Sequence, residues 1–268
     1  MKLFYDAIGV AHAPVESLQN TRIVCLVPSI TELLCDLGLA PYLVGRTGFC
    51  IHPAESVAKI AKVGGTKDVN INKIRSLQPT HLIVNIDENE RPTVEQCSQF
   101  IPHIVVTHPN TVADNFALYR LLGGIFGVLS QAEALCKALS LVQAEVQANL
   151  DELAPKQVLY CIWKDPWMTI SADTYIADML SYKAWHQVDA ATENASSAIG
   201  RYPVFNWSAT WIKQVDLILL SSEPYRFTEQ DVASVAQQTG KPVRLVDGEM
   251  LSWYGSRAIA GLAYLRDL

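Results

Sequence analysis

Residues 22–53 read RIVCLVPSITELLCDLGLAPYLVGRTGFCIHP, and their pattern of strand, helix and strand decides the fold. The run Ile23–Val27 is apolar and favours a β-strand, which Pro28 ends. Ser29 and Glu32 have the spacing of a capping box, so Ser29 is predicted to be the N-cap of a helix. Gly38 is predicted to end this helix, because glycine favours the backbone that closes a helix.

A polar loop follows the second predicted strand, Tyr42–Val44. It places Arg46, Phe49, Cys50 and His52 directly after that strand. In open parallel sheets, ligands bind outside the carboxyl ends of the strands. The stretch therefore predicts an α/β fold and one wall of a ligand site.

The alternation of strands and helices continues to the C-terminus. Further strands are predicted at 81–84, 103–106, 158–163, 216–220 and 243–246, and helices at 69–77, 94–100, 111–126, 131–153, 173–181, 207–214, 229–238 and 256–266. Alternation of this kind is typical of parallel sheets. The stretch 131–153 lacks glycine and proline and is rich in helix formers, so it predicts one long helix.

The two halves of the chain share a pattern. Residues 74–84 and 211–220 each read as a short helix, a tight turn and a buried strand, followed by the acidic loops 85–89 and 221–225. We therefore predict two Rossmann-like lobes with mainly parallel sheets, joined by a long backbone helix. The predicted division is an N-terminal lobe (1–128), an interlobe helix (129–154) and a C-terminal lobe (155–268). We expect a ligand cleft between the lobes, because such clefts are frequent ligand sites.

Composition excludes several classes of protein. The 268 residues are 50% apolar and 18% charged, which is typical of a globular protein. The net charge of −6 and the absence of a basic run argue against nucleic-acid partners. Every apolar run is too short to span a bilayer. Asp6 interrupts the apolar N-terminal stretch, so we read no signal peptide and expect a cytoplasmic location, or a periplasmic one if the N-terminus is incomplete.

Several motifs resemble those of a known family. They are VPSITEL at 27–33, VG at 44–45, GGT at 64–66 and the helix-to-strand unit 74–84 with LQP at 77–79. With these motifs the chain resembles the class III, helical-backbone substrate-binding proteins of ABC importers, which bind vitamin B12, ferric siderophores and haem. The segments 45–53, 85–89 and 247–257 resemble a bacterial subgroup of this family without a signal peptide.

The resemblance implies a function. We expect a substrate-binding protein, not an enzyme, that recognises a metal chelate or corrinoid such as cobalamin, a ferric siderophore or haem. No covalent cofactor is implied, and the resemblance suggests an ABC permease as partner. One alternative is a cytoplasmic enzyme or cofactor-handling protein that uses the same cleft. Another is an interaction protein whose cleft is vestigial.

The loops predicted to face the cleft are rich in large side chains with polar tips. We select as ligand-binding residues Arg46, Phe49, Cys50, His52, Lys67, Glu88 and Asn89 in the first lobe, and Trp163, Trp167, Tyr202, Tyr225, Glu249, Trp253, Tyr254 and Arg257 in the second. Aromatic faces with a few fixed polar groups suit a flat amphipathic ligand. The alternative is that the tryptophans fill the cores of the lobes.

Cys50 and His52 are the candidate metal ligands. A thiolate and an imidazole suit zinc, copper or haem iron. The alternative is a buried thiol beside a loop histidine, because two residues do not complete a structural zinc site. A strongly lowered Cys50 pKa would favour the enzyme alternative. The sequence contains no GxSxG, HExxH or GxGxxG motif, so no catalytic residue is predicted.

Overall fold

The computed structural model describes residues 2–148, 150–189 and 200–268, and the chain forms two compact units. Unit 1 contains Met1–Pro109, Ala113–Ala138 and Tyr254–Arg257. Unit 2 contains Asn110–Val112, Leu139–Trp253 and Ala258–Leu268. The chain therefore passes between the units more than once. Residues 110–112 belong to unit 2 although unit 1 flanks them in sequence, and residues 254–257 belong to unit 1 although unit 2 flanks them.

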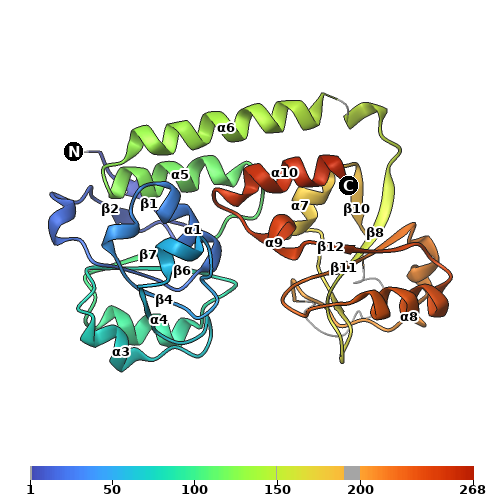
Figure 1. Cartoon of the computed structure of the whole chain (residues 1–268), viewed down its shortest axis with the longest axis horizontal. Coiled ribbons are helices and arrows are strands. Elements are labelled where there is room, and N and C mark those ends of the chain that lie inside the picture. Colours follow the sequence, from blue (N-terminus) through green and yellow to red (C-terminus); the bar gives the residue numbers. More distant parts are fainter. Residues whose placement is uncertain (1, 149, 190–199) are drawn as a thin grey trace. The chain divides into compact units, whose positions relative to one another are not determined.

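Unit 1 is built on a five-stranded parallel sheet (Figure 1). Its strands are β3 (Ile23–Cys25), β4 (Leu43–Arg46), β5 (Ala61–Lys62), β6 (His81–Asn85) and β7 (His103–Thr107), in the order β5-β4-β3-β6-β7. The helices of the unit are α1 (Pro28–Asp36), α2 (Ala54–Val57), α3 (Ile71–Ser76), α4 (Arg91–Ser98) and α5 (Asp114–Ile125). Strands β1 (Phe4–Tyr5) and β2 (Ala11–His12) form a separate antiparallel hairpin.

Unit 2 contains a second, mainly parallel sheet. Its strands are β8 (Lys156–Trp163), β9 (Met168–Thr169), β10 (Trp185–Gln187), β11 (Leu217–Ser221) and β12 (Val243–Val246), in the order β10-β8-β11-β12. Only β9 is antiparallel, and it pairs with β8. The helices are α7 (Tyr175–Ser181), α8 (Glu229–Thr239), α9 (Gly248–Ser252) and α10 (Arg257–Asp267), the last of which begins in unit 1.

Helix α6 (Leu129–Gln147) carries the chain from unit 1 into unit 2 and corresponds to the long helix predicted at 131–153 (Figure 1). The prediction of an α/β protein with two mainly parallel sheets is confirmed. The division into 1–128, 129–154 and 155–268 stays a prediction. No helix in the described part of the chain is long and apolar enough to cross a membrane.

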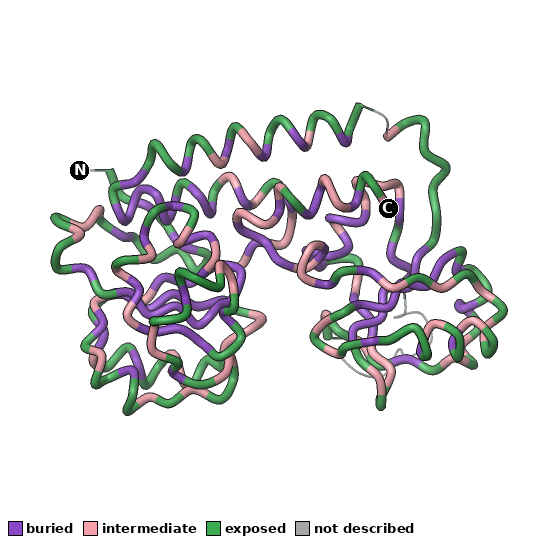
Figure 2. The backbone as a smooth tube through the Cα atoms, in the orientation of Figure 1, coloured by how far each residue is buried: buried purple, intermediate pink, exposed green. Residues whose placement is uncertain are grey.

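The strands of each sheet form the buried centre of their unit (Figure 2). In unit 1, Val24, Leu82 and Val84 pack with Ile74 of α3. In unit 2, the buried cluster joins strand residues with aromatic rings, and it contains Leu159, Ile218, Leu220, Phe205, Trp211 and Phe227. Burying the apolar side chains of these strands is the main favourable contribution to folding.

The predicted capping box at Ser29 is wrong. The N-cap of helix α1 is Val27, two residues before Ser29, with Pro28 in the first turn, and no side chain caps the helix. Proline suits the first helical position because its missing N–H would have had no partner there. Glu32 instead forms an ion pair with Arg257.

Candidate functional site

The order of strands in unit 1 places a topological switch point beside β3. The chain continues from β3 to β4 on one side, and β6 lies on the other side. Loops that leave neighbouring strands in opposite directions create a crevice at their carboxyl ends, where open α/β sheets bind ligands. The loops after β4 and β6 carry most of the predicted site residues of the first lobe.

Hydrogen bonds join the loops that follow β4, β5 and β6. The Gly48 amide donates to the Gly64 carbonyl at 2.7 Å. The side-chain amide of Asn89 donates to the carbonyls of Thr66 at 2.9 Å and Leu26 at 3.3 Å. Asn89 therefore holds the loops together. Its contact with a ligand stays a prediction.

Phe49 is the most exposed aromatic residue among the predicted site residues, at 62% of its accessible surface. Its ring lies beside Gly65, where an added Cβ would be 3.4 Å from the ring. Ile51 and Ile86 are also exposed, at 49% and 47%. We call Phe49, Ile51 and Ile86 the unit 1 platform. Lys67, in the loop after β5, is exposed as well.

Arg46, which was selected as a ligand-binding residue, is buried in the structure. It is only 4% exposed, and its guanidinium donates to the carbonyls of Val57 at 2.9 Å and Thr47 at 3.0 Å. A buried arginine that holds two carbonyls of its own loop is a structural residue, because leaving those carbonyls unpaired would be costly. Sequence position alone did not show this burial.

Cys50 is fully buried, and its sulfur accepts a hydrogen bond from the Thr31 hydroxyl at 3.2 Å. The Thr47 hydroxyl lies 3.1 Å from the same sulfur. Burial raises the pKa of the Cys50 thiol, although these hydrogen bonds oppose the shift. His52 is half-buried. Within the described ranges, no group of three or more His, Cys, Asp or Glu side chains is placed to hold a metal ion.

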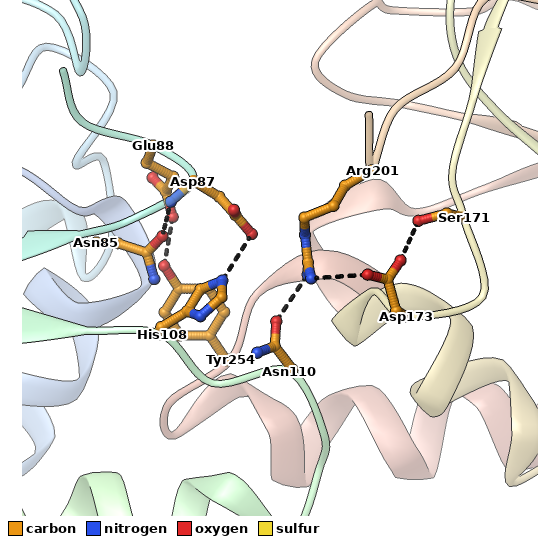
Figure 3. Close-up of polar contacts among 9 residues, drawn as sticks. All are labelled: Asn85, Asp87, Glu88, His108, Asn110, Ser171, Asp173, Arg201 and Tyr254. Atoms are coloured by element: carbon orange, nitrogen blue, oxygen red, sulfur yellow. Dashed lines mark hydrogen bonds and ion pairs between the residues drawn. The ribbon is translucent and has the colours of Figure 1, made fainter. Parts of the chain in front are cut away.

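The loop after β6 carries two polar pairs, which Figure 3 shows. The Tyr254 hydroxyl donates to a Glu88 carboxylate oxygen at 2.5 Å. Burial and the neighbouring Glu88 carboxylate raise the pKa of Tyr254 well above its usual value. Asp87 lies 3.4 Å from the His108 imidazole, which follows β7. His108, which the sequence places at a strand end, therefore belongs to the edge of the sheet that carries the predicted site.

Arg257 forms a largely buried bidentate ion pair with Glu32 of α1, at 2.6 and 2.7 Å. The two side chains are 10% and 14% exposed. This geometry satisfies the guanidinium within the protein. Arg257 is therefore engaged in an internal pair, and its selection as a ligand-binding residue stays a prediction.

The switch point of unit 2 lies between β8 and β11. Trp163 is the last residue of β8 and is 39% exposed. Its ring makes an edge-to-face contact with Tyr225, with centroids 5.6 Å apart. The next residue, Lys164, forms an ion pair with Asp231 at 2.8 Å. An aromatic pair at this edge is a surface on which a flat ligand can stack.

Trp167 and Trp253 both have packing contacts in unit 2, and their selection as ligand-binding residues stays a prediction. Trp167 packs against the unit 2 core and stacks on Phe227, with centroids 5.5 Å apart. Trp253 is 8% exposed, and its indole N–H donates to Glu223 at 2.7 Å. The alternative that tryptophans fill the cores therefore describes both residues. Burial raises the pKa of the Glu223 carboxyl.

The other predicted residues of unit 2 lie nearer the surface. Tyr202 is 38% exposed, while Tyr225 and Glu249 are half-buried. We call Trp163 and Tyr202 the exposed unit 2 aromatics.

Unit 2 also contains a pocket of about 600 Å³ that sequence reasoning missed as a site. It is lined by Asn110, Thr111, Ala172, Asp173, Thr174, Ala177, Asp178, Ser181, His186, Gln187 and Arg201. One Arg201 nitrogen donates to Asn110 at 2.7 Å, and another lies 3.4 Å from Asp173 (Figure 3). Arg201 lies 91 positions after Asn110 in the sequence. Only folding brings the segment Asn110–Thr111 to it.

Two relatives in sequence resemble this chain. The uncharacterized ABC transporter substrate-binding lipoprotein YvrC of Bacillus subtilis (strain 168) is 24% identical over 266 residues, which cover 92% of this chain and 79% of the relative. The vitamin B12-binding protein of Photorhabdus laumondii is 24% identical over 160 residues. That second match spans 60% of this chain and 58% of the relative.

Solved structures share the fold. The periplasmic vitamin B12-binding protein BtuF of Vibrio cholerae matches with a TM-score of 0.77 and 16% identity, over 92% of this chain and 95% of BtuF. The periplasmic heme-binding protein RhuT of Roseiflexus sp. RS-1 matches with a TM-score of 0.76 and 19% identity, over 92% of this chain and 97% of RhuT. The predicted resemblance to class III receptors is confirmed. The model of the family described as periplasmic binding protein matches residues 23–240, and the chain belongs to that family.

Proposed function

We propose that this protein binds a metal chelate or corrinoid with a flat, partly apolar face. The proposed stacking residues are Phe49 of the unit 1 platform and Trp163 of the exposed unit 2 aromatics. The family match supports a binding protein, and relatives named for vitamin B12 and heme support this class of ligand. The cleft between lobes that the sequence predicts stays a prediction.

The observation that carries the proposal is the exposure of aromatic rings at the carboxyl ends of both sheets. Phe49 follows β4, the neighbour of β3, and Trp163 ends β8, which flanks the switch point of unit 2. Exposing large apolar side chains to water is unfavourable, so an exposed ring at a ligand-binding edge favours a role in binding. Macrocycles and chelates offer the flat faces on which such rings stack.

The remaining predicted residues have secondary roles in the proposal. Lys67, Tyr225 and Glu249 are proposed polar contacts of the ligand. Of the candidate metal pair, only the His52 imidazole is retained, because a buried thiol with a raised pKa is a poor metal ligand. An ABC permease is the proposed partner, since one relative is named an ABC transporter substrate-binding lipoprotein. The cytoplasmic location predicted from the sequence stays a prediction.

Thiol chemistry at Cys50 is not supported. The enzyme alternative predicts a strongly lowered pKa for this thiol, because the thiolate is the nucleophile. Burial instead raises the pKa of Cys50. The observed environment is that of a structural cysteine.

A titration followed by tryptophan fluorescence tests the proposal. All six tryptophans lie in unit 2, so quenching reports on unit 2, which contains Trp163. We expect saturable quenching by cyanocobalamin, haem or a ferric siderophore at micromolar or lower concentration, about −8 kcal/mol of binding free energy or better. Visible absorption of the bound ligand gives an independent readout. If none of the three ligands binds, the proposal is wrong.

Substitution of the stacking residues is the sharper test. We expect F49A and W163A each to weaken binding by about 1–4 kcal/mol, as for an aromatic anchor at an interface. Y5A is the control, because Tyr5 is a 64% exposed aromatic residue of the β1–β2 hairpin and does not belong to the loops after β4, β6 or β8. Equal effects of F49A and Y5A would remove Phe49 from the site.

A further inference from the structure

The segment Tyr254–Arg257, which we call the strap, is anchored in unit 1 by its first and last residues. Tyr254 donates to Glu88 in the loop after β6, and Arg257 pairs with Glu32 of α1. The anchoring groups are largely buried. Hydrogen bonds that involve a charged partner in such surroundings are among the stronger ones in proteins.

Gly255 completes the attachment of the strap. Its amide donates to the Asn115 side chain at 2.6 Å, and its carbonyl accepts from the Tyr119 hydroxyl at 2.8 Å. Its φ of +81° favours glycine, and an added Cβ would lie 3.2 Å from atoms of Ser29 and Leu33. Both the amide and the carbonyl of Gly255 are therefore hydrogen-bonded, and this part of the strap packs closely against α1.

The residue before the strap is held just as specifically in unit 2. The indole N–H of Trp253 donates to the Glu223 carboxylate, and the Ser252 hydroxyl donates to the same oxygen at 2.8 Å. Glu223 lies in the loop after β11, the strand beside the unit 2 switch point. Consecutive residues therefore bond to an acid in the loop after β11 and to an acid in the loop after β6.

We propose that the Trp253–Tyr254 peptide is a conformational coupling device that links the loop after β11 in unit 2 to the loop after β6 in unit 1. A single planar peptide joins the two residues whose side chains are anchored, so the distance between their Cα atoms is fixed. An opening of one loop then shifts the equilibrium of the other, and linkage requires that the effect be reciprocal. The device is independent of the identity of the ligand.

Hydrogen exchange of the full chain without ligand tests the coupling. W253F removes the indole N–H and keeps an aromatic ring, so it removes the bond to Glu223. We expect the Gly255 and Asp87 amides of unit 1 to exchange about tenfold faster, as the loss of a hydrogen bond to a charged group predicts. K164Q is the control, because it breaks the Lys164–Asp231 pair of unit 2 without touching the strap.

The reciprocal variant is Y254F, which removes only the hydroxyl that bonds to Glu88. We expect faster exchange at the Ser222 and Gly248 amides of unit 2, which bond to Val246 and Ser222 respectively. The coupling is absent if each variant changes amides in its own unit alone. It is also refuted if K164Q produces the same change in unit 1, because that pattern indicates general destabilisation. A double-mutant cycle of W253F and Y254F measures the coupling energy directly.

Discussion

Single residues in this protein owe their roles to burial more than to chemical type. Arg46 and Arg257 both carry a guanidinium in the predicted site, yet both bond within the protein. Phe49 is an ordinary core residue by type and is exposed. The protein also offers a direct comparison of two bidentate Arg–Glu pairs within unit 1, Arg257–Glu32 and Arg120–Glu133, of which only the first is buried.

We expect R257M to lower the free energy of unfolding by about 3 kcal/mol or more, because it leaves the Glu32 carboxylate buried without its cation. Urea denaturation measures the change. The control R120M breaks the exposed pair with Glu133 and should have a much smaller effect, because solvent screens exposed pairs. The double variant E32M/R257M should recover most of the loss. A lasting deficit in the double variant would show that packing, and not the unpaired charge, causes it.

At the scale of elements, register and close approach decide which side chains meet. The parallel pairing of β6 with β7 places His81 opposite His103, and the rings stack with centroids 4.7 Å apart. Helix α5 packs on β1 through Gly124, where a Cβ would lie 2.1 Å from the Phe4 ring. Both contacts join elements whose residues are far apart in sequence.

The histidine pair predicts a dependence of stability on pH. Burial, with contributions from His103 and His12, lowers the pKa of His81 to about 4 from an ordinary 6.5. Between these values the unfolded chain binds a proton that the folded chain does not, so unfolding takes up a proton. Stability therefore falls as the pH falls from 6.5 towards 4, by roughly 3 kcal/mol at most.

Urea unfolding at a series of pH values checks this slope. H81Q should flatten it, because the group that titrates differently in the two states is gone. H186Q is the control, since His186 is an exposed residue of β10 in unit 2. An unchanged slope in H81Q would assign the acid sensitivity to other groups.

The packing of α5 predicts the effect of one added methyl group. G124A forces the new Cβ against the Phe4 ring, and overpacking of this kind costs about 1–3 kcal/mol. Thermal unfolding measures the loss. G200A should be nearly neutral, because among the described residues beyond its chain neighbours no heavy atom lies within 4 Å of the corresponding Cβ. The double variant F4A/G124A should lose less than the sum of the single changes, since the ring that clashes is absent.

At the scale of the whole molecule, the chain has two compact units with separate buried clusters. The chain order does not follow the units, because residues 110–112 and 254–257 each belong to the unit that their sequence neighbours do not. Two-state unfolding is not the expectation for such a chain. The placement of every tryptophan in unit 2 gives an optical probe for that unit alone.

We expect tryptophan fluorescence and far-ultraviolet circular dichroism to report different urea transitions. Circular dichroism follows the helices of both units, whereas fluorescence follows unit 2. G124A, which destabilises unit 1, should move a transition seen by circular dichroism more than it moves the fluorescence midpoint. Coincident shifts in both signals would show that the units unfold as one.

The sequence predicted the elements well because strands and helices depend on local patterns. Strand β12 was predicted at 243–246 and lies at Val243–Val246, and the predicted helix 229–238 is α8, Glu229–Thr239. Local patterns were insufficient where the partner is distant. The predicted capping role of Glu32 is wrong because its partner, Arg257, lies 225 residues away. The short strands β1, β2, β5, β9 and β10 were not predicted, because two or three residues carry no clear periodicity.

The local order of residues also predicted which loops follow the strands and which residue types they carry. Phe49, Lys67, Trp163 and Tyr202 are exposed there, as a ligand surface requires. The folded structure alone divides these residues from Arg46, Cys50, Trp167 and Trp253, which pack or bond internally. The physical reason is that the periodicity of a segment reflects its own backbone, whereas the burial of a side chain depends on segments that reach it only in the folded chain.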